Sequence, residues 1–160
     1  MRVTWSLFAT LLLGAWAWPD PRPQAEALCR GAERFLVERV GMTAISGADT
    51  IDDWRTGKTV AGCRVTSAGL TSRPSADEAA LLYQRLRAAG WTRTPDPRDA
   101  PNEASLRFRM GRTDCLFNFY TGGLLATQAE MEVNNAVVPG RGQMRYNVVV
   151  LCVPAMDAVP

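Results

Sequence analysis

The side chains that carry most enzyme chemistry are unevenly represented in this sequence. Its 160 residues include no histidine, which removes the commonest general base near neutral pH and the commonest metal ligand. It also removes the partner that activates serine and cysteine nucleophiles. The motifs G-x-S-x-G, H-E-x-x-H and S-x-x-K are absent. The sequence therefore excludes the familiar hydrolase templates, and we predict no cofactor.

Paired carboxylates would still allow hydrolysis of the kind seen in glycosidases. The acidic candidates outside the expected helices are Asp49, Asp52, Asp53, Asp96, Asp99 and Asp114. Their spacing singles out no pair, and the first three do not match an EF-hand calcium loop. Aspartates in a segment rich in glycine and threonine usually make local turn hydrogen bonds. A small carboxylate-based hydrolase therefore stays an alternative, and we predict no metal site.

One short motif resembles a nucleotide site. Gly57-Lys58-Thr59 looks like the end of a phosphate-binding loop, but that loop needs glycine where Asp52 stands. The segment also precedes an expected strand, whereas a phosphate loop connects a strand to a helix. We therefore reject nucleotide binding at this position.

Four cysteines form the second chemically active group: Cys29, Cys63, Cys115 and Cys152. They are widely spaced and form no C-x-x-C motif, so they predict two structural disulfides and neither a redox pair nor a zinc site. Three pairings are possible. Joining Cys29 to Cys63 and Cys115 to Cys152 closes the shorter loops, which favours it, but the sequence leaves the pairing open.

The N-terminal residues have the layout of a secretory signal. Residues 1–2 are a short basic start, residues 3–13 are an apolar run, and A-W-A at 15–17 has the pattern of a cleavage site. Prolines at 19, 21 and 23 argue against an uncleaved anchor or a buried first helix. We expect residues 1–17 to be a signal peptide and residues 18–160 to be one globular domain, exported to the periplasm or secreted, without a stable membrane span.

Two helices are expected in the exported part. Apolar residues recur at three-to-four spacing from Pro23 to Val40, which predicts a helix that ends at Gly41. A second helix is predicted over 76–89, because Ser75-Ala76-Asp77-Glu78 has the pattern of a capping box. Trp91, directly after it, is expected to be buried. Residues 41–57 show no sustained period, so we expect a connecting loop with room for one short element.

Alternation of apolar and polar residues predicts strands over 59–68, 106–110, 115–120 and 144–153. The last is apolar on both faces near its end, which argues against a position at a bare sheet edge. Three prolines predict a long exposed loop over 92–104, and residues 124–133 are compatible with strand or helix. The resulting prediction is an α+β fold, with two helices packed on one face of a mostly antiparallel sheet of about four strands.

The same alternation predicts which side chains share the face of the sheet that these helices leave uncovered. If the cysteine, phenylalanine and valine side chains face the helices, the other face carries Arg64, Thr66, Arg107, Arg109, Asn118, Tyr120, Arg145 and Asn147. Arginine and tyrosine are favoured at interfaces, so the candidate binding residues are Arg64, Arg107, Arg109, Tyr120 and Arg145.

The competing interpretation is an ordinary solvated sheet face, because only one of the 18 basic residues is a lysine and arginine stands nearly everywhere else. Under either interpretation Arg107 and Arg109 should face solvent, while Leu106, Phe108 and Met110 should be buried. Replacing either arginine should then change stability by about 0.5 kcal/mol or less.

Composition and charge leave a binding role as the expected function. Eighteen basic and 16 acidic residues give a net charge of +2, which does not favour nucleic acid or an anionic membrane as the main partner. We expect an exported, disulfide-stabilised, non-enzymatic module that binds a protein or a cell-envelope component, anionic if the arginine face binds it. Alternatives are an inhibitor or immunity-type module acting through loop 92–104, and the carboxylate-based hydrolase.

Overall fold

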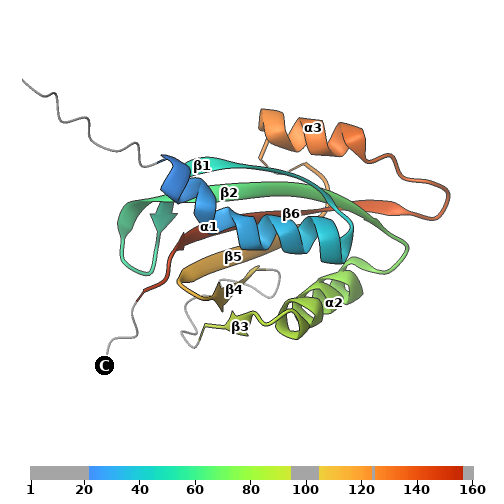
Figure 1. Cartoon of the computed structure of the whole chain (residues 1–160). Coiled ribbons are helices and arrows are strands. Elements are labelled where there is room, and N and C mark those ends of the chain that lie inside the picture. The colour runs from blue at the N-terminus through green and yellow to red at the C-terminus, as the bar shows by residue number, and fades with distance from the viewer. Residues whose placement is uncertain (1–21, 95–104, 124, 157–160) are drawn as a thin grey trace, which may run out of the picture.

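The structure, a computed structural model, describes residues 22–94, 105–123 and 125–156 of the chain (Figure 1). Its helical segments are α1 (Arg22–Arg34), the π-helical turn η1 (Phe35–Val40), α2 (Ser75–Ala88) and α3 (Gln128–Ala136). Its strands are β1 (Thr43–Asp53), β2 (Lys58–Thr71), β3 (Thr92–Arg93), β4 (Ser105–Met110), β5 (Thr113–Tyr120) and β6 (Met144–Pro154). None of the helices in these ranges has the length and hydropathy needed to cross a membrane.

The six strands form one sheet in the order β1-β2-β6-β5-β4-β3, and every neighbouring pair is antiparallel. The last strand, β6, lies between β2 and β5 at the centre of the sheet (Figure 1). This position confirms that the final strand is not at an edge. It also explains the apolar residues on both faces of β6, because both faces are covered.

Helices α1 and α2 cover one face of the sheet, where the hydrophobic core lies. The ring of Phe117 on β5 is near its centre, in edge-to-face contact with Phe35 of η1 at 6.4 Å and with Trp91 at 5.5 Å between ring centroids. Phe108 of β4 is buried against Phe117 and stacks on Tyr83 of α2. The predicted burial of Trp91 and Phe108 is therefore confirmed.

Helix α3 covers part of the opposite face. Its Val133 is buried outside the main core, and the side-chain oxygen of Asn134 accepts a 2.8 Å hydrogen bond from the amide of Asn147 on β6. Asn147 stands between Tyr146 and Val148, whose side chains belong to the core below α1 and α2. Since successive strand residues point to opposite faces, α3 and α1 lie on opposite sides of the sheet.

The predicted α+β class is confirmed, but two expected loops contain strands, and the segment left open between strand and helix contains a helix. The expected loop over 41–57 contains β1, an 11-residue strand whose small, half-exposed side chains give a weak hydrophobic period. The expected loop over 92–104 begins with the two-residue strand β3. The undecided segment over 124–133 contains the start of α3. The sheet therefore has six strands where about four were expected, and a third helix lies on the face expected to be open.

The predicted capping box at the start of α2 is also wrong. Ser75 is the first helical residue, Pro74 occupies the cap position, and no side chain caps the helix. The carboxylate of Glu78 instead accepts hydrogen bonds from Thr71 at 2.7 Å and from Arg73 at 3.1 Å. Glu78 thus ties α2 to the end of β2, and this longer-range contact takes the place of the local cap.

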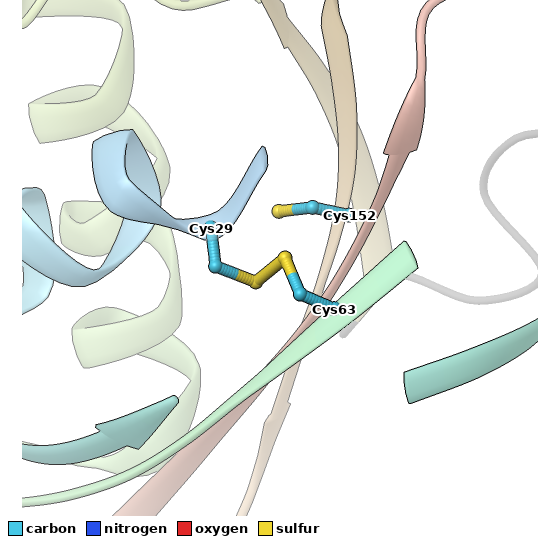
Figure 2. A group of neighbouring side chains, drawn as sticks. All are labelled: Cys29, Cys63 and Cys152. Carbon is cyan, nitrogen blue, oxygen red and sulfur yellow. A yellow bond between two sulfur atoms is a disulfide. The ribbon is translucent and has the colours of Figure 1, made fainter. Parts of the chain in front are cut away.

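Two disulfides join Cys29 to Cys63 and Cys115 to Cys152, the pairing that shorter loops favour. Cys63, Cys152 and Cys115 stand directly opposite one another on three neighbouring strands, β2, β6 and β5. The sulfur atoms of Cys29, Cys63 and Cys152 lie within 4.8 Å of one another (Figure 2). The first disulfide fixes α1 on the sheet, and the second crosslinks its two central strands.

Candidate binding surface

A buried ion-pair network lies where the β1–β2 hairpin folds over β4 and β5. Arg55, in the hairpin turn, donates to both carboxylate oxygens of Asp53 and, through Nη1, to Asp114 Oδ2 at 2.9 Å. Arg109 of β4 donates through Nε and Nη2 to the same Asp114. Arg109 also donates to the carbonyl oxygen of Met156, near the C-terminus. One aspartate thus joins two arginines from distant parts of the chain.

The arginines keep both aspartates of this network ionised. Burial by itself raises the pKa of Asp114, but hydrogen bonds and positive charge from Arg109 and Arg55 outweigh it and lower that pKa below its usual value. Burial opposes the ionisation of Asp53 in the same way, and contacts with Arg55 together with the charge of Arg107 lower its pKa. Both carboxylates are therefore structural anions at neutral pH.

The ionised state of Asp53 and Asp114 argues against the carboxylate-based hydrolase alternative. A glycosidase needs one carboxylic acid with a raised pKa to protonate the leaving group, whereas the pKa values of Asp53 and Asp114 are lowered. Asp49 forms an ion pair with Arg64, and Asp52 accepts from Thr59. The four described candidates thus make structural contacts. Asp96 and Asp99 lie outside the described residues, as does most of the loop over 92–104.

The expectation that Arg107 faces solvent is wrong. The predicted strand register is correct, since Phe108 is buried in the core and Leu106 and Met110 pack partly against it. However, Arg107 is only 4% exposed, and Arg109 pairs with Asp114. The reason is tertiary, because segments outside β4 fold over the face on which these arginines stand.

The other three predicted binding residues lie beside or under α3. Arg64 of β2 pairs with Asp49 of β1 at 2.8 Å, with about a third of its side chain exposed. Arg145 of β6 donates to the carbonyl oxygens of Asn134 and Val137 and so caps the C-terminal end of α3. These arginines hold the fold together, and neither presents a free charge to an anionic partner.

Tyr120 joins β5 to α3. Its hydroxyl donates a 2.9 Å hydrogen bond to the carboxylate of Glu130, whose second oxygen accepts from the backbone N–H groups of Leu125 and Ala126. Burial, followed by this contact with the anionic Glu130, raises the pKa of Tyr120. Tyr120 therefore stays protonated and serves as a hydrogen-bond donor.

The predicted arginine face is not continuous. Arg64 and Arg107 belong to the same row of side chains across the sheet, but Leu151 of β6 and Leu116 of β5 stand between them. Three strand spacings separate the two arginines, about 14 Å. The structure thus places Arg107 with Arg109 under the β1–β2 hairpin, and Arg64, Tyr120 and Arg145 near α3.

A groove of about 480 Å³ opens between the first two turns of α2 and the end of β5. The helix contributes small side chains and Tyr83, and the strand contributes the ring of Phe119. Phe119, which lines the groove, stacks on Tyr146 with 5.2 Å between ring centroids. Because alanines on the helix leave space above this aromatic floor, the groove can take an apolar group. Its lining residues are Ser75, Ala76, Ala79, Ala80, Tyr83, Phe119, Tyr120 and Thr121.

A smaller cavity of about 210 Å³ lies between β1 and the start of α3. Five consecutive residues of β1, Ile45 to Asp49, line it together with Arg64 and Thr66 of β2, the N-cap residue Thr127 of α3, and Ala129 within that helix. Consecutive strand residues point to alternate faces. The cavity must therefore reach the outer edge of β1.

Two site residues were missed in the sequence, and only one had a local signal. Thr127-Gln128-Ala129-Glu130 has the capping-box pattern, and the Thr127 hydroxyl accepts from the Glu130 N–H at 3.2 Å. This motif could have identified the start of α3 and drawn attention to Glu130. Arg55 has no such signal, because its partner Asp114 is 59 residues away.

Cys29, Cys63 and Cys152 are the only group of potential metal ligands among the described residues. Their sulfur atoms are bound in disulfides and therefore lack the thiolate charge that metal coordination needs. In comparisons with known proteins, no family model matches the chain, and no curated protein and no solved structure is significantly similar to it.

Proposed function

We propose that this protein is an exported, non-enzymatic binding module that holds a protein or cell-envelope component in the groove between α2 and β5. The observation that supports this most is the chemistry of the groove, which combines small helical residues with the aromatic side chains of Tyr83 and Phe119. A groove with buried aromatic rings at its base favours binding of an apolar group. The partner is accordingly expected to present an apolar segment.

Export is the second part of the proposal. The two disulfides point to an oxidising compartment, and residues 1–17 carry the pattern of a cleavable signal. Intact-mass measurement of the protein recovered from its own host should give a mature N-terminus at Trp18. A retained Met1 would contradict the export proposal.

Affinity capture from the host's own envelope fraction tests the groove. We expect the partner captured by the wild-type protein to be lost with Ala80→Trp, because Ala80 is exposed and lines the groove, so that an indole there would fill it. Ala88→Trp is the matched control, since Ala88 is an exposed alanine at the other end of the same helix, outside the groove. Thermal unfolding of both variants checks that they are folded.

Equal capture by wild type, Ala80→Trp and Ala88→Trp would remove the groove as the binding site. The loop over 92–104 would then be the next candidate, in line with the inhibitor alternative. That result would leave the export proposal intact, because the mature N-terminus is measured separately.

A further inference from the structure

The outer edge of β1 is the longest open strand edge in the described part of the chain. On one side β1 pairs with β2 in an unbroken register, from Thr43 opposite Ala68 to Asp53 opposite Lys58. On its other side no strand of residues 22–94, 105–123 or 125–156 pairs with it. Natural proteins usually block such an edge with charged side chains, proline or a bulge. β1 contains no proline, lysine or bulge, and its three charged residues, Asp49, Asp52 and Asp53, lie in its C-terminal half.

The backbone groups that point outward can be identified from one hydrogen bond. The N–H of Thr50 donates to Asp49 Oδ1 at 2.8 Å, so it points away from β2. Backbone groups alternate in direction along an antiparallel strand, and Ala44, Ser46 and Ala48 therefore also direct their N–H and C=O groups outward. The Asp49 carboxylate already occupies the Thr50 N–H, so this group is not free to pair with another strand. The open stretch is 43–48, which carries no charged side chain.

We propose that β1 pairs with β1 of a second copy of this chain, antiparallel, about a two-fold axis at Ser46. In this register Ser46 stands opposite its own copy, and Ala44 stands opposite Ala48 of the second copy. The three outward-facing residues of each strand then exchange about six backbone hydrogen bonds, two for each opposed pair. A two-fold axis uses the same surface on both copies, so the interface closes as a dimer.

Charge is compatible with this register. Asp49 stands opposite Thr43 of the second copy, so no two carboxylates of the paired strands face each other directly. On the helix side, the carboxylate of Glu33 of α1 accepts a 2.7 Å hydrogen bond from the Ser46 hydroxyl. The two Glu33 side chains flank the axis and repel each other. Added salt should therefore strengthen the dimer by screening this repulsion.

Shape is the observation that selects a second copy as the occupant. A β-carbon built on Gly47 would meet no atom within 4 Å, and Gly47 lines the 210 Å³ cavity beside α3. In the proposed register Ile45 of the second copy stands opposite Gly47, on the same face of the extended sheet. This partly exposed apolar side chain would enter the space above the glycine. A strand from an unrelated protein would fill this space only if it had an apolar residue opposite Gly47.

Sedimentation velocity over a concentration series tests the pairing in the oxidised protein recovered from its host. We expect a dimer whose dissociation constant rises at least about tenfold with Ala48→Lys, because lysine blocks strand pairing at an edge. Thr50→Lys is the matched control. Thr50 is exposed on the same face of β1, but it lies just beyond the open stretch, so this variant should dimerise like wild type.

A backbone variant provides an independent test. Ser46→Pro removes an outward N–H and no hydrogen bond of the β1–β2 ladder, so it should abolish the dimer and leave the unfolding transition cooperative. A monomeric wild type, or equal dissociation constants for Ala48→Lys and Thr50→Lys, would overturn the proposal. So would a monomeric protein that binds an extended peptide along β1, since another protein would then be the occupant. None of these outcomes depends on the groove beside α2.

Discussion

Arg55 and Asp114 form a buried ion pair across 59 residues of sequence, with 2.9 Å between Arg55 Nη1 and Asp114 Oδ2. Their side chains are 2% and 0% exposed. The pair joins the β1–β2 turn to the start of β5, two segments separated along the chain by α2 and the three strands β2, β3 and β4. It therefore holds the hairpin over the face of the sheet that bears Arg107 and Arg109.

Removing the aspartate of this pair should be strongly destabilising. Asp114→Ala leaves Arg55 buried without one of its two anionic partners, and the loss of one member of a buried pair typically costs about 3 to 5 kcal/mol. Urea unfolding should show this loss. Asp49→Ala is the control, because the Arg64–Asp49 pair is about one third exposed and should contribute only about 0 to 1 kcal/mol. Equal losses in the two variants would contradict this role of burial.

Stability should fall in acid because of the same network. The pKa values of Asp53 and Asp114 are lowered in the folded state, so their contribution is present above the unfolded value of about 3.9. It is lost as the pH falls through the folded values. Urea midpoints measured from pH 7 to below pH 4 should decline less steeply for Asp114→Asn than for wild type. Parallel declines would show that these aspartates do not cause the acid sensitivity.

The two disulfides should contribute similarly to stability. They span 34 and 37 residues, and loops of nearly equal length restrict the unfolded chain to nearly the same extent. Each double variant, Cys29→Ala with Cys63→Ala or Cys115→Ala with Cys152→Ala, should lose about 2 to 4 kcal/mol in denaturant unfolding. Non-reducing peptide mapping of wild type should recover both crosslinked peptides, and four free thiols would refute the assignment.

Phe108 should be among the most sensitive core positions. It is buried, stacks on Tyr83 with 5.9 Å between centroids and meets Phe117 edge to face at 6.0 Å. Phe108→Ala should cost about 3 to 5 kcal/mol because it removes these contacts and leaves a cavity. Met131, exposed on α3, is the comparison, and Met131→Ala should stay within about 0.5 kcal/mol of wild type. A small effect at Phe108 would indicate a loosely packed core.

Arg107 should behave as a buried polar residue. Arg107→Gln is now expected to cost about 1 to 3 kcal/mol, because it disturbs polar contacts shielded from water. This exceeds the 0.5 kcal/mol or less expected for a solvated strand face. Arg87→Gln, at an exposed position on α2, should change the free energy of unfolding by about 0.5 kcal/mol or less. If both substitutions were neutral in urea unfolding, Arg107 would have to be accessible in solution.

The sequence alone predicted the features that depend on local period. Alternation with a period of two placed Phe108 in the core and Arg107 on the other face, and both assignments are correct. The shorter-loop rule favoured the observed cysteine pairing without deciding it. The first two helices were predicted within one or two residues at each end, because their apolar stripes and terminal glycines are local signals.

The tertiary structure alone decided what covers the second face of the sheet. Strand alternation tells which side chains share a face, but it carries no information about which distant segment packs there. Arg55 reaches Asp114 only after the β1–β2 hairpin has folded over β5, and Glu130 reaches Tyr120 only once α3 has docked on the sheet. The predicted arginine face is therefore divided, with Arg107 buried and the side chains of Arg64 and Arg109 about a third exposed. The groove beside α2 exists because two elements distant in sequence meet around small side chains.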